Sequence, residues 1–234
     1  MKKFFIWICV MFLTAGSALA QDANSEKISG SIDIRISDFV YPEKGENITG
    51  QSLNAFWKYK QYSGLLETSY ISESHSFTIK PSIQFSKGPL SALVGLSTND
   101  TGSDFFQVGI WYADSFGKFK VLVDARNYFS ITSQENGYID NFVRVMYPIT
   151  DKLSAGIDFG YDHWWEGNEH NWYFFGPRAV YQITKDVSIY IRVSREWNVK
   201  KVAVETIAES TTVTTMERET DITDKIRLGL IIAF

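Results

Sequence analysis

Strict two-residue alternation between apolar and polar side chains is the feature that most constrains this chain. Near the start, Ile32 and Ile34 flank Asp33, and the pattern extends several residues in both directions. Successive side chains of a β-strand point to opposite faces, so the alternation predicts a strand with one apolar and one polar face. The pattern recurs at residues 76–85 and closes the chain at residues 222–234. The sequence therefore predicts an all-β protein.

Read by this periodicity, the chain divides into about twelve expected strands. They span residues 28–37, 51–60, 65–72, 76–85, 91–98, 105–113, 118–128, 138–147, 153–162, 172–181, 187–197 and 222–234. Every second connection is short and turn-like, and the others are mostly longer, the last covering residues 198–221. Short turns at one end, long loops at the other and an even strand count are typical of bacterial outer-membrane barrels. We therefore expect a transmembrane antiparallel β-barrel with up-and-down topology.

The composition of the two faces supports this interpretation. We assign no Asp, Glu, Lys or Arg to the apolar face, although 21% of the chain is charged. A charge that faces lipid costs about 2–4 kcal/mol at the bilayer midplane. Aromatic residues stand at the strand ends beside the short turns, where such rings suit the headgroup level: Tyr59, Phe85, Tyr112, Tyr147, Tyr181 and Phe234. The alternative is a soluble sandwich or lipocalin-like barrel, in which long loops have no reason to favour one end.

The first twenty residues have the layout of a secretory signal peptide. Lys2 and Lys3 precede the apolar segment 4–13, and Ala18-Leu19-Ala20 presents the small residues that signal peptidase reads. The alternative of a transmembrane anchor is disfavoured, because the apolar segment is too short for a helix across about 30 Å of bilayer. We expect cleavage that leaves residues 21–234 as one barrel domain.

Charge and cysteine content exclude several functions. Without the two lysines of the signal peptide, 21 Lys and Arg face 27 Asp and Glu, a net charge of −6. This charge disfavours nonspecific nucleic-acid binding. The single cysteine, Cys9, lies in the signal peptide, so the mature chain has no thiol. Because no His, Asp or Glu spacing matches a metal site, we assign neither a metal nor a cofactor.

The polar face carries a surplus of positive charge. We place on it twelve cations and the eight acids Asp33, Glu67, Asp124, Asp140, Asp158, Asp162, Glu196 and Asp224. Nine of the cations are our candidate lumen-lining residues: Arg35, Lys58, Lys80, Lys120, Arg126, Arg144, Arg178, Arg192 and Arg227. Low-dielectric walls focus the field of fixed charges, so such a lumen favours small anions. The alternative is that these charges pair across the lumen and close it.

The last ten residues, from Lys225 to Phe234, have apolar side chains at alternate positions and a final aromatic residue. They resemble the terminal strand signal of Gram-negative outer-membrane proteins, which implies periplasmic chaperones and the barrel-assembly machinery as partners. In length, strand count and lumen charge the chain is similar to the oligogalacturonate-specific porin family, monomeric twelve-stranded channels for acidic sugars. We therefore expect a monomer in outer-membrane lipid, with both termini in the periplasm.

The segment that follows the ninth expected strand is rich in tryptophan. Trp164, Trp165 and Trp172 are candidates for stacking on sugar rings at the mouth of the barrel, and equally for the outer aromatic girdle. The girdle is the interpretation that the sequence favours.

Together these features favour a passive channel for small anionic solutes, acidic oligosaccharides among them. The alternative is a non-conducting structural or surface-interaction barrel that acts through its extracellular loops, above all residues 198–221. A barrel protease or lipase is disfavoured, since no serine or carboxylate pair has the neighbours that such chemistry requires. We expect no enzyme activity.

Overall fold

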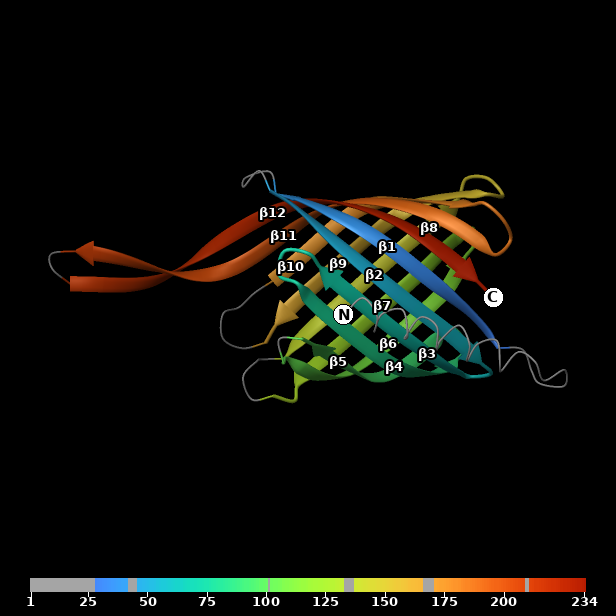
Figure 1. Cartoon of the computed structure of the whole chain (residues 1–234), viewed down its shortest axis with the longest axis horizontal. Helices are drawn as coiled ribbons and strands as arrows, with labels where there is room; N and C mark the ends of the chain where they lie inside the picture. Colours follow the sequence, from blue (N-terminus) through green and yellow to red (C-terminus); the bar gives the residue numbers. More distant parts are fainter. Residues whose placement is uncertain (1–27, 42–45, 101, 133–136, 166–170, 209–210) are drawn as a thin grey trace.

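The computed structural model describes residues 28–41, 46–100, 102–132, 137–165, 171–208 and 211–234. In these residues, twelve antiparallel strands close into one barrel, with each strand paired to its sequence neighbours and β1 paired to β12 (Figure 1). The expected all-β, up-and-down barrel is confirmed. The signal-peptide prediction falls on residues 1–20, which lie outside the described residues.

The strands agree with the expected ones to within a few residues, except at the long connections. They are β1 (Ser29–Tyr41), β2 (Glu46–Tyr59), β3 (Tyr62–Ile71), β4 (Ser76–Lys87), β5 (Leu90–Asn99), β6 (Asp104–Phe116), β7 (Phe119–Ser130), β8 (Tyr138–Pro148), β9 (Leu153–Trp164), β10 (Asn171–Gln182), β11 (Val187–Ala208) and β12 (Thr211–Ala233). The short turns and the ends of β1 and β12 that begin and close the barrel lie at the same end, which we call the turn end. The opposite end is the loop end.

The stagger between strands sets the shape of the barrel. We start at Phe234 on the closing strand and step from each residue to its register partner on the next strand. After one full turn of the barrel this path returns to the closing strand at Thr220, so the stagger is 14 residues. Twelve strands with this stagger tilt by about 40° and enclose a barrel of roughly 11 Å radius. A row of paired residues therefore climbs toward the loop end as it passes from β1 to β12.

The outward face of the barrel is apolar. Ile36, Ile157 and Leu228 are among its exposed side chains. Aromatic rings gather beside the turns as expected: the Tyr62 and Phe85 ring centroids are 5.7 Å apart, and those of Phe119 and Tyr147 are 5.2 Å apart. No helix within the described ranges is long and apolar enough to cross a membrane.

Charged residues toward the loop end correct the expectation of an uncharged outer face, and one oppositely charged pair shows this clearly. Arg195 and Asp224 are paired across β11 and β12 and point outward, with Arg195 Nε 2.8 Å from Asp224 Oδ1. The assignment of Asp224 to the lumen was wrong, because it shares the strand face of the exposed Ile226 and Leu228. The pair lies toward the loop end of the two strands, and its opposite charges neutralise each other.

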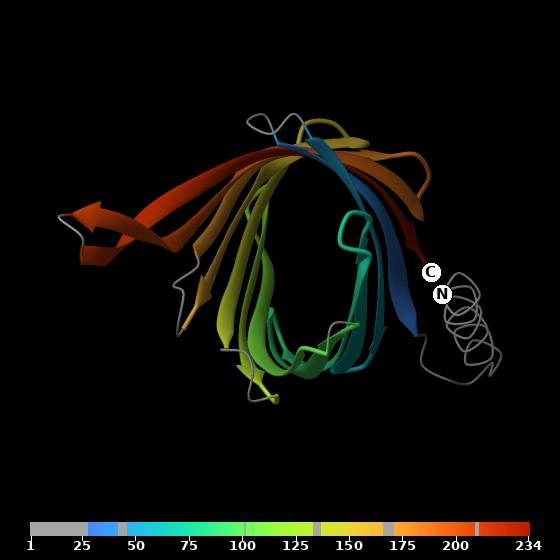
Figure 2. The ribbon, with the colours of Figure 1, turned by 60° about the vertical axis from the view of Figure 1, so that its left-hand side comes forward.

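The β11–β12 hairpin continues past the barrel as a two-stranded ribbon, where the sequence predicted a long loop. The last residue of β11 paired with β10 is Val199, but β11 stays paired with β12 as far as Ala208 and Thr211. Figure 2 shows the ring of strands from a second direction, with the orange-red ribbon leaving it on one side. The expected loop is therefore mainly strand.

An ion cluster holds the root of the ribbon together. Lys200 Nζ lies 3.2 Å from Asp221 Oδ2 and 3.4 Å from Glu219 Oε2. The hydrogen bond to Asp221 and the charges of both carboxylates raise the pKa of Lys200.

Two prolines interrupt the ladder without shifting it. Pro81 on β4 and Pro177 on β10 lie where pairing to the next strand is missing, yet the register is the same on both sides of each gap. A proline has no N–H for the ladder, which accounts for each gap. At Pro81 the side chain of Gln107 fills the break, donating from Nε2 to the carbonyls of Pro81 at 3.4 Å and Leu96 at 2.9 Å.

Candidate functional site in the lumen

A cavity of about 900 Å³ lies inside the barrel, and all twelve strands contribute side chains to its wall. Pro89 and Ile231 line it at the turn end, and Tyr70 and Trp172 line it at the loop end. The cavity therefore extends along most of the length of the barrel.

Most of the candidate cations reach this cavity. It is lined by Arg35, Lys58, Lys80, Arg126, Arg144, Arg192 and Arg227. Arg178 is buried in the wall, with its guanidinium carbon 3.6 Å from the centre of the Tyr190 ring. Lys120 is exposed near the turn after β6 and does not line the cavity.

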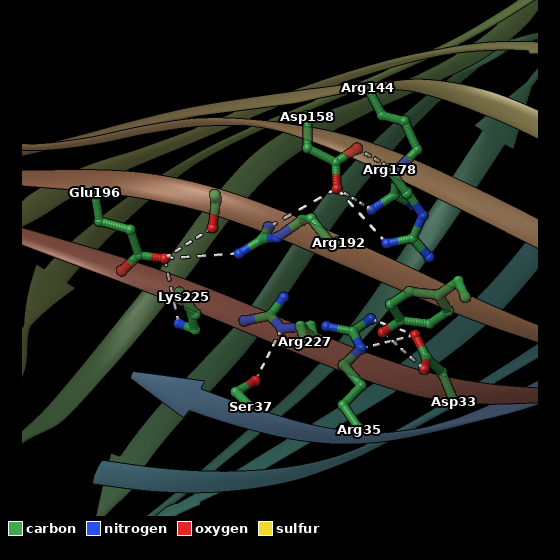
Figure 3. Close-up of polar contacts among 12 residues, drawn as sticks. Asp33, Arg35, Ser37, Arg144, Asp158, Arg178, Arg192, Glu196, Lys225 and Arg227 are labelled. Carbon is green, nitrogen blue, oxygen red and sulfur yellow. Dashed lines mark hydrogen bonds and ion pairs between the residues drawn. The ribbon is translucent and has the colours of Figure 1, made fainter. Parts of the chain in front are cut away.

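Three arginines stand side by side on neighbouring strands and form what we call the arginine row. The register pairs Arg178 on β10 with Arg192 on β11, and Arg192 with Arg227 on β12. Figure 3 shows these side chains together with the acids around them. The Cβ atoms of residues paired on one face are about 4.5–5.5 Å apart, so like charges in this arrangement repel one another. The row is stable only if counter-charges offset that repulsion.

Asp158 supplies most of the counter-charge and is completely buried. Arg144 binds it through two hydrogen bonds, from Nε at 2.8 Å and from Nη2 at 3.1 Å. Nη1 of Arg178 and Nη1 of Arg192 lie 3.6 Å and 3.8 Å from its second oxygen. One carboxylate thus serves three guanidinium groups, which leaves an excess of positive charge in the wall.

A second acid, Glu196, is shared in the same way. Its Oε1 lies 3.7 Å from Arg192 Nη2 and 3.4 Å from Lys225 Nζ. Arg227 donates from Nε to Ser37 Oγ at 3.1 Å, and its side chain forms no ion pair within the described ranges. Cations therefore outnumber acids along this wall.

Arg192 has donors that the protein does not satisfy. Its side chain is 3% exposed, its guanidinium carbon lies 4.5 Å from the centre of the Phe174 ring, and its Nε and Nη2 groups have no hydrogen-bond acceptor among the described residues. A buried donor left without an acceptor costs about 1–3 kcal/mol, and more when it is charged. Both groups are buried, so the positive charge of Arg192 is incompletely compensated by the protein beside the cavity that this residue lines.

On the lumen side of strands β3 to β7, in contrast to the arginine row, the charged side chains are paired and closely packed. Arg126 on β7 binds Glu67 on β3 across the lumen, and its Nη2 lies 2.5 Å from Asp124 Oδ2. Gln107 and Tyr128 are fully buried beside it. Arg126 is thus neutralised by acidic partners in this sector, whereas cations outnumber acids along the arginine row.

The three tryptophans divide between the two faces of the barrel. Trp164 stacks on Tyr138 at 4.6 Å on the lumen side, and Trp172 lines the cavity. Trp165 packs against Phe129 at 5.2 Å, and both are exposed on the outside. The outer girdle accounts for Trp165, whereas the other two face inward.

Phe234 closes the barrel at the turn end. Its backbone exchanges hydrogen bonds of 3.0 Å and 2.9 Å with Gly30, and its ring is exposed on the outside. A Cβ added to Gly30 would lie 2.5 Å from Cζ of this ring, so the absence of a side chain there makes room for it. Among the described residues, no three His, Cys, Asp or Glu side chains lie together as a metal site would require.

We compared the sequence and the structure with known proteins, and only the comparison with solved structures found matches. No protein-family model and no curated protein matches the chain. Among solved structures, the KdgM porin in complex with disordered oligogalacturonate aligns with a TM-score of 0.56 and 11% identity, covering 87% of this chain and 99% of that one. The NanC porin gives 0.56 and 10%, covering 86% and 98%, and an outer membrane channel from Pseudomonas putida F1 gives 0.53 and 11%, covering 92% and 98%. The chain has the fold of these outer-membrane porins.

Proposed function

We propose that the protein is an outer-membrane channel through which small anionic solutes diffuse passively. The observation that carries this proposal is the arginine row on the cavity wall, where cations outnumber the acids Asp158 and Glu196. A carboxylate matches the planar fork of a guanidinium group and can accept two hydrogen bonds from it. The cavity reaches toward both ends of the barrel, as passage of a solute requires.

The same wall suits transport rather than tight binding. A channel must attract its solute but also release it, which weak binding at several neighbouring positions achieves. Asp158 and Glu196 offset part of the positive charge of Arg178 and Arg192, so the row attracts anions less strongly than three unpaired arginines would. A carboxylate can pass from Arg192 to Arg227 or Lys225, which also line the cavity.

Acidic oligosaccharides are the solute class that we favour within this function. Cations repeated on successive strands suit a solute that carries a carboxylate on successive units. The structurally similar KdgM porin was solved in complex with oligogalacturonate, which supports this class. We also propose a monomer with both termini in the periplasm, cleavage after residue 20, and recognition of the strand ending in Phe234 by the assembly machinery.

Liposome swelling with refolded residues 21–234 tests the channel directly. Vesicles are placed in an acidic disaccharide or in a neutral disaccharide of the same size, and the rates of swelling are compared. We expect Arg192→Gln combined with Arg227→Gln to lower the acidic rate by about threefold to tenfold, because each charge attracts a nearby anion even in water. The neutral rate should change little. The control is Lys185→Gln, at an exposed turn position outside the cavity.

Equal loss of both rates in the double variant would contradict charge selection by the row. No swelling in the folded wild type would exclude a channel. The second candidate, a barrel that acts through its surface, would then be favoured by the β11–β12 ribbon, which projects from the barrel (Figure 1).

A further inference from the structure

Two aspartates stand next to each other at the loop end of the cavity. Asp140 on β8 is paired in register with Asp162 on β9, and both line the cavity. Their Cβ atoms are therefore about 4.5–5.5 Å apart, which brings the carboxyl groups within reach of each other. A solute that moves between the outside and the arginine row passes this pair.

The pair differs from the other lumen acids in its partners. Asp158 and Asp124 are each bound by an arginine, but the lumen ion pairs of the described residues include neither Asp140 nor Asp162. Oδ1 of Asp162 is buried and accepts no hydrogen bond from any described residue. Because that oxygen is closed off from the cavity, a solute cannot supply the missing donor.

The groups around the pair do not neutralise both charges. Lys80 on β4 is one nearby cation, and its Nζ lies 3.5 Å from the Tyr128 hydroxyl and 4.8 Å from the centre of the Tyr128 ring. Arg126, the register partner of Asp140 on β7, is a second cation, but its guanidinium group is already bound by Glu67 and Asp124. Tyr138 on β8 lies beside it, and Glu196 on β11 adds a further negative charge. Trp172, the register partner of Asp162 on β10, brings no charge.

We propose that Asp140 and Asp162 share one proton near neutral pH and that this proton sets how easily anions pass the loop end of the lumen. Two adjacent carboxylates cannot both ionise cheaply, and they titrate as a coupled pair. With one proton between them, an O–H on one carboxyl group donates to an oxygen of the other. The inference rests on the proposed channel function, because it concerns the solutes that the channel selects.

The charge of the Asp140–Asp162 pair determines whether a rise in pH helps or hinders the passage of anions. With the shared proton the pair carries one negative charge, and without it the pair carries two. Loss of the proton as the pH rises therefore adds one negative charge beside the path of the anions. At a separation of about 8 Å in water, one unit charge changes the local concentration of a monovalent ion by about twofold.

Reversal potentials measured across a potassium chloride gradient test this proposal. We expect the chloride preference of the wild-type channel to fall by about twofold in a single step as the pH rises from about 5 to about 9. Asp162→Asn and Asp140→Asn should each keep the high chloride preference and lose the step. The matched control is Asp124→Asn, also a lumen acid but one bound to Arg126; it should shift the preference at every pH and keep the step.

A second measurement does not depend on conduction. The infrared carbonyl band of a protonated carboxylic acid should be present in the folded wild type at neutral pH and absent from Asp162→Asn. A chloride preference that is the same at every pH, or a step that persists in Asp162→Asn, would overturn the shared proton while leaving the channel intact. Absence of chloride preference at any pH would instead overturn the proposed function.

Discussion

Asp158→Asn is the substitution that best tests how the lumen wall is held together. The wild-type carboxylate is fully buried and faces Arg144, Arg178 and Arg192. Removing one partner of a buried ion pair typically costs 3–5 kcal/mol, because the remaining charge stays buried without compensation. Arg144 is 25% exposed and can turn toward the lumen water, which lowers the cost. We therefore expect a loss of about 3 kcal/mol in the free energy of unfolding.

Urea unfolding of the refolded barrel in lipid vesicles, followed by tryptophan fluorescence, measures this loss. Asp151→Asn, at an exposed turn position, is the control and should change the free energy of unfolding by less than about 0.5 kcal/mol. Adding Arg144→Gln to Asp158→Asn should restore only part of the stability, since Arg178 and Arg192 keep their charges. A loss below about 1 kcal/mol in Asp158→Asn would refute the view that this carboxylate offsets the row.

Three further predictions concern the barrel outside the row. Gly160→Ala places a Cβ 1.9 Å from Cε1 of the Phe174 ring, and the urea transition should show a loss of about 1–3 kcal/mol from overpacking; an unchanged midpoint would contradict this packing. Phe234→Ala should slow insertion into vesicles that contain purified assembly machinery, with little effect on spontaneous refolding in detergent; equal rates of assisted insertion would exclude the proposed signal. Shortening the ribbon to a turn near Lys200 should leave conductance unchanged, because pairing of β11 with β10 ends at Val199; loss of conductance would show that the ribbon belongs to the channel.

Alternation was sufficient to predict the barrel because the two faces of each strand meet different surroundings. Alternation marks a strand only where one face of that strand must stay apolar. It therefore failed to predict the strands past Val199, where the ribbon leaves the barrel. The same local rule, applied strictly along β12, would have placed Asp224 outside with Ile226. The sequence pattern therefore predicted which segments form strands, but it did not predict where along each strand the apolar outer face ends.

The lumen charges were predictable as a group, and their partners were not. The pairing of Arg126 with Glu67 joins β7 to β3 over 59 residues, and no local pattern indicates it. The arginine row likewise depends on the register between β10, β11 and β12, which places Arg178 beside Arg192. Register arises from the closure of the whole barrel, so the sequence predicted a cationic lumen without showing which cations are neutralised.

The reversal potential of the wild-type protein in a planar bilayer, at neutral pH and across a salt gradient, tests directly whether the barrel conducts and selects anions. The excess of cations on the cavity wall predicts an open channel whose reversal potential lies on the chloride side of zero. A preference for cations, or no conductance from protein shown to be folded and inserted, would contradict the selection of anions by the arginine row.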